Sequence, residues 1–103
     1  MVFLKQAEPM KQYTRAFILI QCEPMREKDV IEELMKMEEV IEMHMITGEY
    51  DVIAVVQVKR HFLEADYDNV FNSAIAKIEG AKYVVDTNTI IGMASKTKIF
   101  DST

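Results

Sequence analysis

The stretch Met45-Ile-Thr-Gly-Glu-Tyr-Asp-Val-Ile-Ala-Val-Val-Gln-Val58 decides the fold, because a polar reversal leads directly into an apolar strand. Gly48 lies in that reversal, and glycine adopts a positive φ without steric cost. The residues from Val52 to Val58 form a short, near-continuous apolar run, which is typical of a strand buried on both faces. We therefore predict a tight reversal at Gly48 followed by an interior strand.

The segment before the reversal, Val40 to Thr47, alternates in polarity as a half-exposed strand does. The alternation places Ile41, Met43 and Met45 on one side, and Glu42 and His44 on the other, together with Val40 and Ile46. Further upstream, Ala16 to Cys22 is rich in β-branched and aromatic side chains and predicts another strand. From about Glu27 to Glu38 the apolar residues follow helical spacing.

Downstream of the reversal, a polar loop from Lys59 to Glu64 precedes a second predicted helix from about Asp66 to Ile78. Gly80 lies where glycine commonly ends a helix. Lys82 to Met93 is a last strand of mixed polarity. The predicted order is β-α-β-β-α-β, in which a strand-helix-strand unit occurs twice.

This order is typical of the ferredoxin-like α+β fold, a four-stranded antiparallel sheet with both helices on one face. The first and third strands, which are the most apolar, should lie in the centre, with the second and fourth at the edges. We assign residues 1–14 to an N-terminal arm, residues 15–94 to the domain and residues 95–103 to a C-terminal tail.

The face of the sheet that the helices do not cover is predicted to be apolar as well. Phe17 and Leu19 point away from Ala16, Ile18 and Ile20, and Ile53 and Val55 point away from Val52, Ala54 and Val56. An uncovered apolar face of this kind favours a two-fold dimer through the sheet, the dimeric α+β barrel arrangement. The alternative is that the N-terminal arm folds back over it.

Composition limits the classes of protein and partner. At 103 residues the chain has room for one domain. Its 17 acidic and 12 basic residues give a net charge of −5, which disfavours direct nucleic-acid binding. No apolar stretch approaches the ~20 residues that a membrane helix needs. A single cysteine and no signal-peptide pattern favour a cytoplasmic location.

The reversal also has the chemistry to hold a small zwitterion. Backbone N–H groups around a glycine turn can converge on an anion, and the carboxylate of Asp51 can accept hydrogen bonds from an ammonium group. Most turns that contain glycine only reverse the chain, so the residues alone leave both readings open.

A resemblance to a known family favours the ligand. The stretches MITGEYDVIAVVQV and GAKYVVDTNTIIGM, joined through a helix, resemble the C-terminal effector (RAM) domain of Lrp/AsnC transcription regulators over about residues 15–94. The family pattern T-G-x-(Y/F)-D matches Thr47, Gly48, Tyr50 and Asp51, and its Thr-x-Thr segment matches Thr87 and Thr89. The resemblance implies an effector, usually an amino acid, that binds to these residues and to Glu49. It also implies that this site lies where subunits meet.

The same resemblance implies a regulatory domain without enzymatic activity or cofactor. It implies a homodimer, with an octamer or another ring of dimers as a larger form, and a full-length Lrp/AsnC regulator as a second partner. Residues 1–14 are too few for the helix-turn-helix of such regulators, so we expect a stand-alone sensing domain.

Other functions stay open at this stage. A small dimeric α+β barrel enzyme, of monooxygenase or isomerase type, would need a catalytic group in the cleft between sheet and helices, which His44 or Tyr83 could supply. A purely structural partner of a regulator and an ACT-type amino-acid-binding domain are further alternatives. Cys22, His44 and His61 lack the short spacing of metal ligands, so we predict no metal site.

Overall fold

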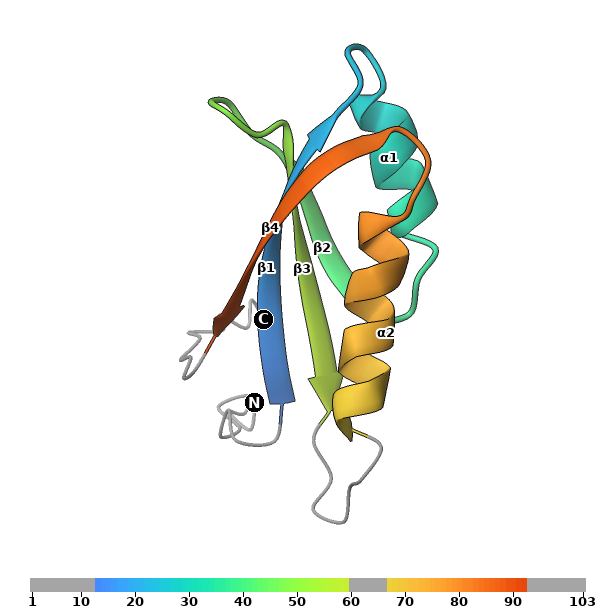
Figure 1. Cartoon of the computed structure of the whole chain (residues 1–103), viewed down its shortest axis with the longest axis vertical. Coiled ribbons are helices and arrows are strands. Elements are labelled where there is room, and N and C mark those ends of the chain that lie inside the picture. The colour runs from blue at the N-terminus through green and yellow to red at the C-terminus, as the bar shows by residue number, and fades with distance from the viewer. Residues whose placement is uncertain (1–12, 60–66, 93–103) are drawn as a thin grey trace, which may run out of the picture.

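The computed structural model describes residues 13–59 and 67–92, which form one βαββαβ unit (Figure 1). Its elements are β1 (Tyr13–Cys22), α1 (Glu27–Leu34), β2 (Val40–Met45), β3 (Val52–Lys59), α2 (Tyr67–Glu79) and β4 (Val84–Gly92). The predicted element order and the ferredoxin-like α+β fold are therefore confirmed. The predicted loop over residues 60–64, His61 and the tail over residues 95–103 lie outside the described residues.

The sheet has the strand order β2-β3-β1-β4, and all three strand pairs are antiparallel. As predicted, the two most apolar strands are central. The register is continuous across the centre, where Ile18 of β1 lies between Ala54 of β3 and Thr89 of β4. Every residue of β1 thus has a neighbour on a strand that comes much later in the chain.

Both helices cover the same face of this sheet (Figure 1). The side chains that point to them from β1 and β3 are fully buried, namely Ala16, Ile18, Ile20, Val52, Ala54 and Val56. Val30 and Leu34 of α1 and Ala74 and Ile78 of α2 complete this core from the other side. Burying one such aliphatic side chain contributes ~1.5–3 kcal/mol, so this layer is the main source of stability.

The first strand is longer than predicted. Tyr13 and Thr14, which we assigned to the arm, pair with Lys59 and Val58 and belong to β1. The reason is that β3 continues to Lys59 and offers these residues backbone partners. Residues 1–12, the rest of the predicted arm, lie outside the described residues.

The first helix is shorter than predicted, since α1 ends at Leu34 rather than near Glu38. After it the backbone bonds tighten to three-residue steps: the N–H of Met37 donates to the Leu34 carbonyl at 3.0 Å, and the N–H of Val40 donates to the Met37 carbonyl at 3.2 Å. Tightening of this kind is common where a helix ends. These bonds turn the Met37 side chain against the core. Met37 therefore fits the apolar pattern of the helix although it lies beyond the end of α1.

The predicted alternation in β2 is wrong at its first residue. Val40 pairs with Val56, but Glu42 pairs with Val55, so Ile41 is an extra residue in a β-bulge. Val40 therefore faces the helices and is 5% exposed, on the same side as Met43 rather than on the side of Glu42. A single inserted residue moves the side chains that precede it in the strand to the opposite face of the sheet.

The second face of the sheet is apolar at its centre, as predicted, while Arg15 and Gln57 continue it as a polar pair. We call it the open face; it comprises Phe17, Leu19, Ile53, Val55 and Ile90. These residues are direct neighbours, because Phe17 pairs with Val55 and Ile90, and Leu19 pairs with Ile53. Phe17, Leu19 and Ile53 are half-buried, and Ile90 is 51% exposed.

Candidate functional site

The reversal between β2 and β3 has the geometry expected of a glycine turn. The N–H of Ile46 donates to the Asp51 carbonyl at 2.9 Å and closes the base of the turn. Gly48 has a φ of +121°, which confirms the positive φ that the sequence predicted. A Cβ added at Gly48 would have no atom within 4 Å. Glycine is therefore favoured at this position by the backbone conformation and not by a lack of space.

The tip of the turn is open to its surroundings. Thr47, Gly48 and Glu49 are exposed, while Tyr50 and Asp51 are half-buried at its base. In Figure 1 the β2–β3 connection lies to the upper left, away from the two helices. Its backbone N–H groups and the side chains of Thr47 and Glu49 are thus accessible to a small molecule or to another subunit.

Asp51 also has a structural role that the sequence did not reveal. Its Oδ2 accepts a hydrogen bond from the N–H of Cys22 at 2.9 Å, and its own N–H donates to the Ile20 carbonyl at 2.9 Å. The β1–β4 register shifts between Gln21 and Cys22, and the carboxylate accepts from a backbone N–H at that irregularity. Asp51 therefore fastens the end of β1 to the start of β3.

Cys22 lies directly against this carboxylate. The thiol is 6% exposed, and burial, followed by the negative charge of Asp51, raises its pKa to about 11. A thiol with that pKa remains protonated at neutral pH and is a poor nucleophile and metal ligand. Cys22 thus acts as a small buried apolar residue beside the turn.

The two threonines of the predicted site lie on β4. Thr87 pairs with Ile20 and Thr89 with Ile18, so both face the helix side and are half-buried. Because Ile20 also pairs with Val52, Thr87 lies in the same row as the start of β3, roughly 10 Å away across β1 at ~4.8 Å per strand. Within one chain the structure therefore does not bring Thr87 into contact with the turn.

Thr89 has a further peculiarity. Its Oγ1 is buried and has no hydrogen-bond partner in the described part of the chain. Buried hydroxyl groups are normally satisfied, because leaving one unpaired costs free energy. Ile18, its neighbour on β1, is apolar and offers no side-chain partner.

The two residues considered for catalysis lie on opposite sides of the sheet. His44 pairs with Ile53 on the side of the open face, and its Nε2 lies 3.0 Å from Oε1 of Glu42. Tyr83 precedes β4 on the helix side, where the Arg26 guanidinium lies 4.5 Å from the centre of its ring. His44 therefore does not face the space between the sheet and the helices, whereas Tyr83 lies on that side.

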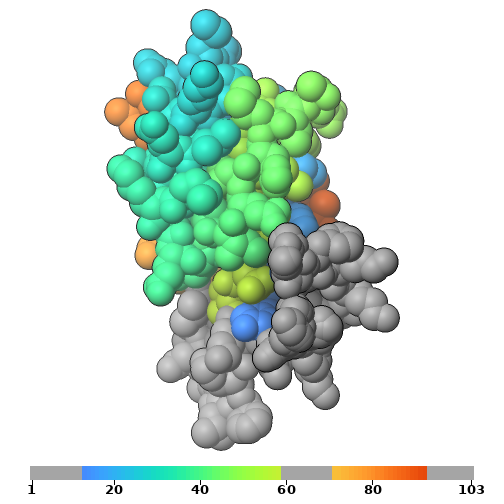
Figure 2. Space-filling model, turned by 180° about the vertical axis from the view of Figure 1, so that it is seen from behind, coloured from blue at the N-terminus to red at the C-terminus, as the bar shows by residue number. Residues whose placement is uncertain are grey.

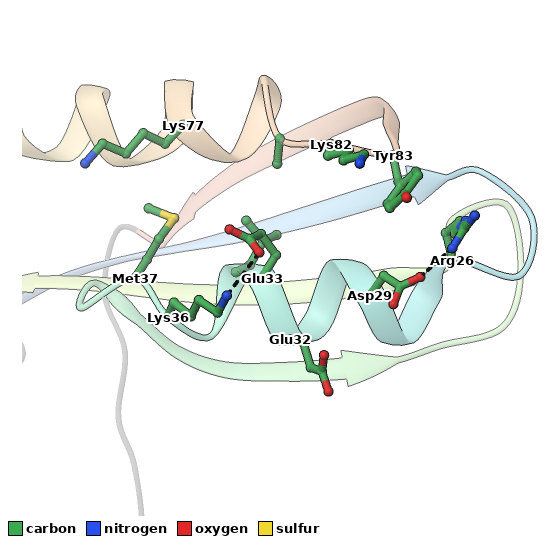
Figure 3. Close-up of a pocket in the computed structure, with 11 residues that line it drawn as sticks. Arg26, Asp29, Glu32, Glu33, Lys36, Met37, Lys77, Lys82 and Tyr83 are labelled. Carbon is green, nitrogen blue, oxygen red and sulfur yellow. Dashed lines mark hydrogen bonds and ion pairs between the residues drawn. The ribbon is translucent and has the colours of Figure 1, made fainter.

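The structure also contains a cleft that sequence reasoning missed. It lies between α1 and the connection from α2 to β4, encloses about 610 Å³ and is lined by charged side chains around Tyr83 (Figure 3). Its walls come from segments far apart in the sequence, so no local motif could have marked it.

Two further results concern the described residues alone. Across residues 13–59 and 67–92, no three His, Cys, Asp or Glu side chains are grouped closely enough to hold a metal ion. Neither helix in these ranges has the length and apolar character needed to cross a membrane.

Comparison with known proteins identifies the family. The sequence profile of the Lrp/AsnC ligand binding domain matches residues 15–98. The chain therefore belongs to the Lrp/AsnC ligand-binding domain family, as its turn and last strand suggested. No curated protein sequence matches it significantly.

Several solved structures share its fold. A hypothetical protein, PHS023, from Pyrococcus horikoshii is 31% identical, with a TM-score of 0.64 over 80% of this chain and 92% of that one. The protein FFRP-DM1 is 32% identical, with a TM-score of 0.65 over 78% of this chain and 99% of that one.

A more distant structure is the feast or famine regulatory protein (Rv3291c) from M. tuberculosis, complexed with L-methionine. It is 19% identical, with a TM-score of 0.65 over 86% of this chain and 56% of that one, and has the same fold.

Proposed function

We propose that this protein is a regulatory domain that binds a small effector, an amino acid, at the Thr47–Asp51 turn where subunits meet. The observation that carries the proposal is the exposed turn at Gly48, whose φ of +121° fixes its backbone in a form that other residues rarely adopt. Family membership supports a ligand at this turn rather than a simple chain reversal.

The chemistry of the turn suits a zwitterion. Its exposed backbone N–H groups can meet a carboxylate, and Glu49, an exposed carboxylate at its tip, can meet an ammonium group. Asp51 contributes mainly by holding the base of the turn through Cys22. Thr87 and Thr89 would join the site only from another subunit, because β1 separates them from the turn within one chain.

Assembly through the open face would complete the site. The apolar residues of that face lie on β1, β3 and β4, and Glu42 and His44 of β2 border them. A contiguous apolar patch on a protein surface often serves an interaction. The open face is predominantly aliphatic and aromatic, and Ile90 is half exposed at its margin. A second copy stacked on it would form the homodimer, and dimers can associate further into an octamer or another ring.

Such an arrangement couples ligand to assembly. An effector held by two subunits binds the assembled form more tightly, so it shifts the equilibrium toward that form by its differential affinity. The domain would act through a full-length regulator of the same family rather than by touching nucleic acid, because its net charge is −5. The related M. tuberculosis protein was crystallised with L-methionine, which supports the amino-acid class. We place this activity in the cytoplasm and assign the domain no enzymatic function.

The test is a thermal-shift screen of the twenty amino acids on the intact chain. An effector at 100-fold its dissociation constant adds ~2.7 kcal/mol of stability. Each kcal/mol raises the midpoint of a domain of this size by about 4 °C or more. We expect one or a few amino acids to raise the midpoint.

Thr47→Ala and Glu49→Gln should abolish that shift without changing the midpoint of the free protein, since both side chains are exposed. Glu38→Gln is the matched control, because Glu38 is also exposed but lies beyond α1. If no amino acid shifts the midpoint at millimolar concentration, effector binding is wrong and a purely structural partner is the remaining reading.

A further inference from the structure

The cleft on the helix side has the dimensions of a ligand site. It encloses about 610 Å³, and sites for small molecules usually measure ~300–1,000 Å³. One wall is α1; the other is the end of α2 with the residues that lead into β4 (Figure 3). Figure 2 shows the molecule from behind, with α1 and β2 forming the surface on that side. The effector turn lies at a different place, because the β2–β3 connection projects to the upper left in Figure 1, away from both helices.

The lining carries an excess of positive charge in an otherwise acidic protein. Its basic residues are Arg26, Lys36, Lys77 and Lys82, and its acidic residues are Asp29, Glu32 and Glu33. Arg26 forms an ion pair with Asp29 at 3.0 Å, and Lys36 forms one with Glu33 at 3.3 Å. Glu32 points away from the space between the helices (Figure 3). Within the described residues, Lys77 and Lys82 are thus left without a carboxylate partner.

Tyr83 is held in an unfavourable backbone conformation at the mouth of this cleft. Its φ is +73°, which a side chain larger than glycine rarely adopts. The Tyr83 carbonyl accepts a hydrogen bond from the N–H of Glu23 at 2.9 Å. Its ring lies 4.5 Å from the Arg26 guanidinium and 5.0 Å from the Lys82 ammonium group. Strained residues that their surroundings hold in place gather at binding sites.

We propose that this cleft binds a small organic anion, separately from the effector at the turn. Its acid group would lie at the ammonium group of Lys82, which has no carboxylate partner among the described residues and lies 5.0 Å from the centre of the Tyr83 ring. Its apolar part would pack on Ala81 and on that ring, which line the same space. The ligand class follows from this combination of unmet positive charge and apolar wall.

The proposal is tested by titrating the ¹⁵N-labelled full chain with four probes and following its backbone amide signals. Benzoate and phenyl phosphate carry both an acid group and an apolar ring, benzamide is the neutral analogue, and inorganic phosphate lacks the ring. We expect saturable shifts at Ala81, Lys82 and Tyr83 with benzoate or phenyl phosphate at millimolar concentration. Tighter binding of one of these two probes identifies the acid group as a carboxylate or a phosphate ester.

Variants separate this site from nonspecific binding. Lys82→Gln should weaken binding of the better probe by roughly two- to fivefold, as expected for a partly exposed charge contact. Lys77→Gln should have a smaller effect, because the Lys77 side chain points away from Lys82 (Figure 3). Lys28→Gln is the control, because Lys28 is exposed on α1 and does not line the cleft. The amide spectrum itself reports whether each variant is folded.

Three outcomes would overturn the proposal: shifts that do not saturate, benzamide binding as well as benzoate, or Lys28→Gln weakening binding as much as Lys82→Gln. Thr47→Ala should leave probe binding unchanged. Failure of the effector screen and failure of the cleft can therefore be told apart.

Discussion

The Oδ2 atom of Asp51 accepts a hydrogen bond from the backbone N–H of Cys22 at 2.9 Å, across 29 positions of the chain. This bond joins the end of β1 to the start of β3, next to the exposed turn. A residue that matches the effector motif of the family thus also secures the backbone on which the motif depends. Effects of its substitution on binding and on stability must therefore be separated.

Asp51→Ala should destabilise the protein by about 1–3 kcal/mol, because it leaves a partly buried N–H group without an acceptor. Asp51→Asn keeps a carbonyl oxygen in the same place and should cost less. Urea denaturation of both variants, followed by circular dichroism, measures the difference. An unchanged free energy of unfolding for Asp51→Ala would show that the bond contributes nothing to the fold.

Gly48→Ala should destabilise by roughly 1–3 kcal/mol, since alanine is strained at a φ of +121°. The matched control is Gly80→Ala. Gly80 has no positive φ, and its added Cβ would meet the Ala76 carbonyl at an ordinary 3.5 Å. There the change should be neutral or slightly stabilising, because alanine restricts the unfolded chain. Thermal midpoints that fall equally in both variants would contradict the conformational explanation.

The Cys22 thiol should make stability depend on pH in the alkaline range. Its pKa rises from 9.0 in the unfolded chain to about 11 in the fold, with burial as the main cause and the charge of Asp51 second. Above pH 9 the unfolded chain releases this proton while the folded one keeps it. Stability is therefore complete below pH 9 and declines as the pH rises toward about 11.

Cys22→Ala should flatten that decline, as measured by urea denaturation at several pH values. Because the native thiol is buried and protonated, it should react slowly with a disulfide reagent at pH 8 and rapidly after unfolding. Rapid reaction of the native protein would mean that the thiol is neither buried nor protonated.

Leu19→Glu should convert the expected dimer into a monomer, because it places a charge in the centre of the open face. We expect the dimer dissociation constant to rise by roughly tenfold or more, measured by analytical ultracentrifugation. Met25→Glu is the control, since Met25 is apolar and 88% exposed in the connection between β1 and α1. A wild-type protein that sediments as a monomer would remove the open face as a dimer interface.

Much of the fold could be predicted because periodicity reports directly on burial. The apolar run from Val52 to Val58 predicted a central strand, and the alternation of Phe17 and Leu19 with their neighbours predicted two apolar faces. The positive φ at Gly48 followed from residue type alone. Gly80 shows the limit of that reasoning, because it follows α2 as predicted yet has no positive φ, and Tyr83 has one instead.

The remaining features arise from tertiary structure. The bulge at Ile41 changes which face Val40 occupies, and only pairing with β3 reveals it. The bond from Cys22 to Asp51 and the stacking of Arg26 on Tyr83 join residues from different elements. The separation of Thr87 from the turn depends on the strand order, which places β1 between them.

The strand order also has a consequence for folding of the chain during its synthesis on the ribosome. Among the described strands β1 comes first in the chain and is apolar on both faces at its centre, yet its neighbours in the sheet are β3 and β4. Ile20 can pair on one side only after Val52 has been synthesised, and on the other side only after Thr87 has been synthesised. Pairings this distant in the chain slow folding. Until β4 has been synthesised, β1 therefore exposes apolar side chains and is a natural target for chaperones.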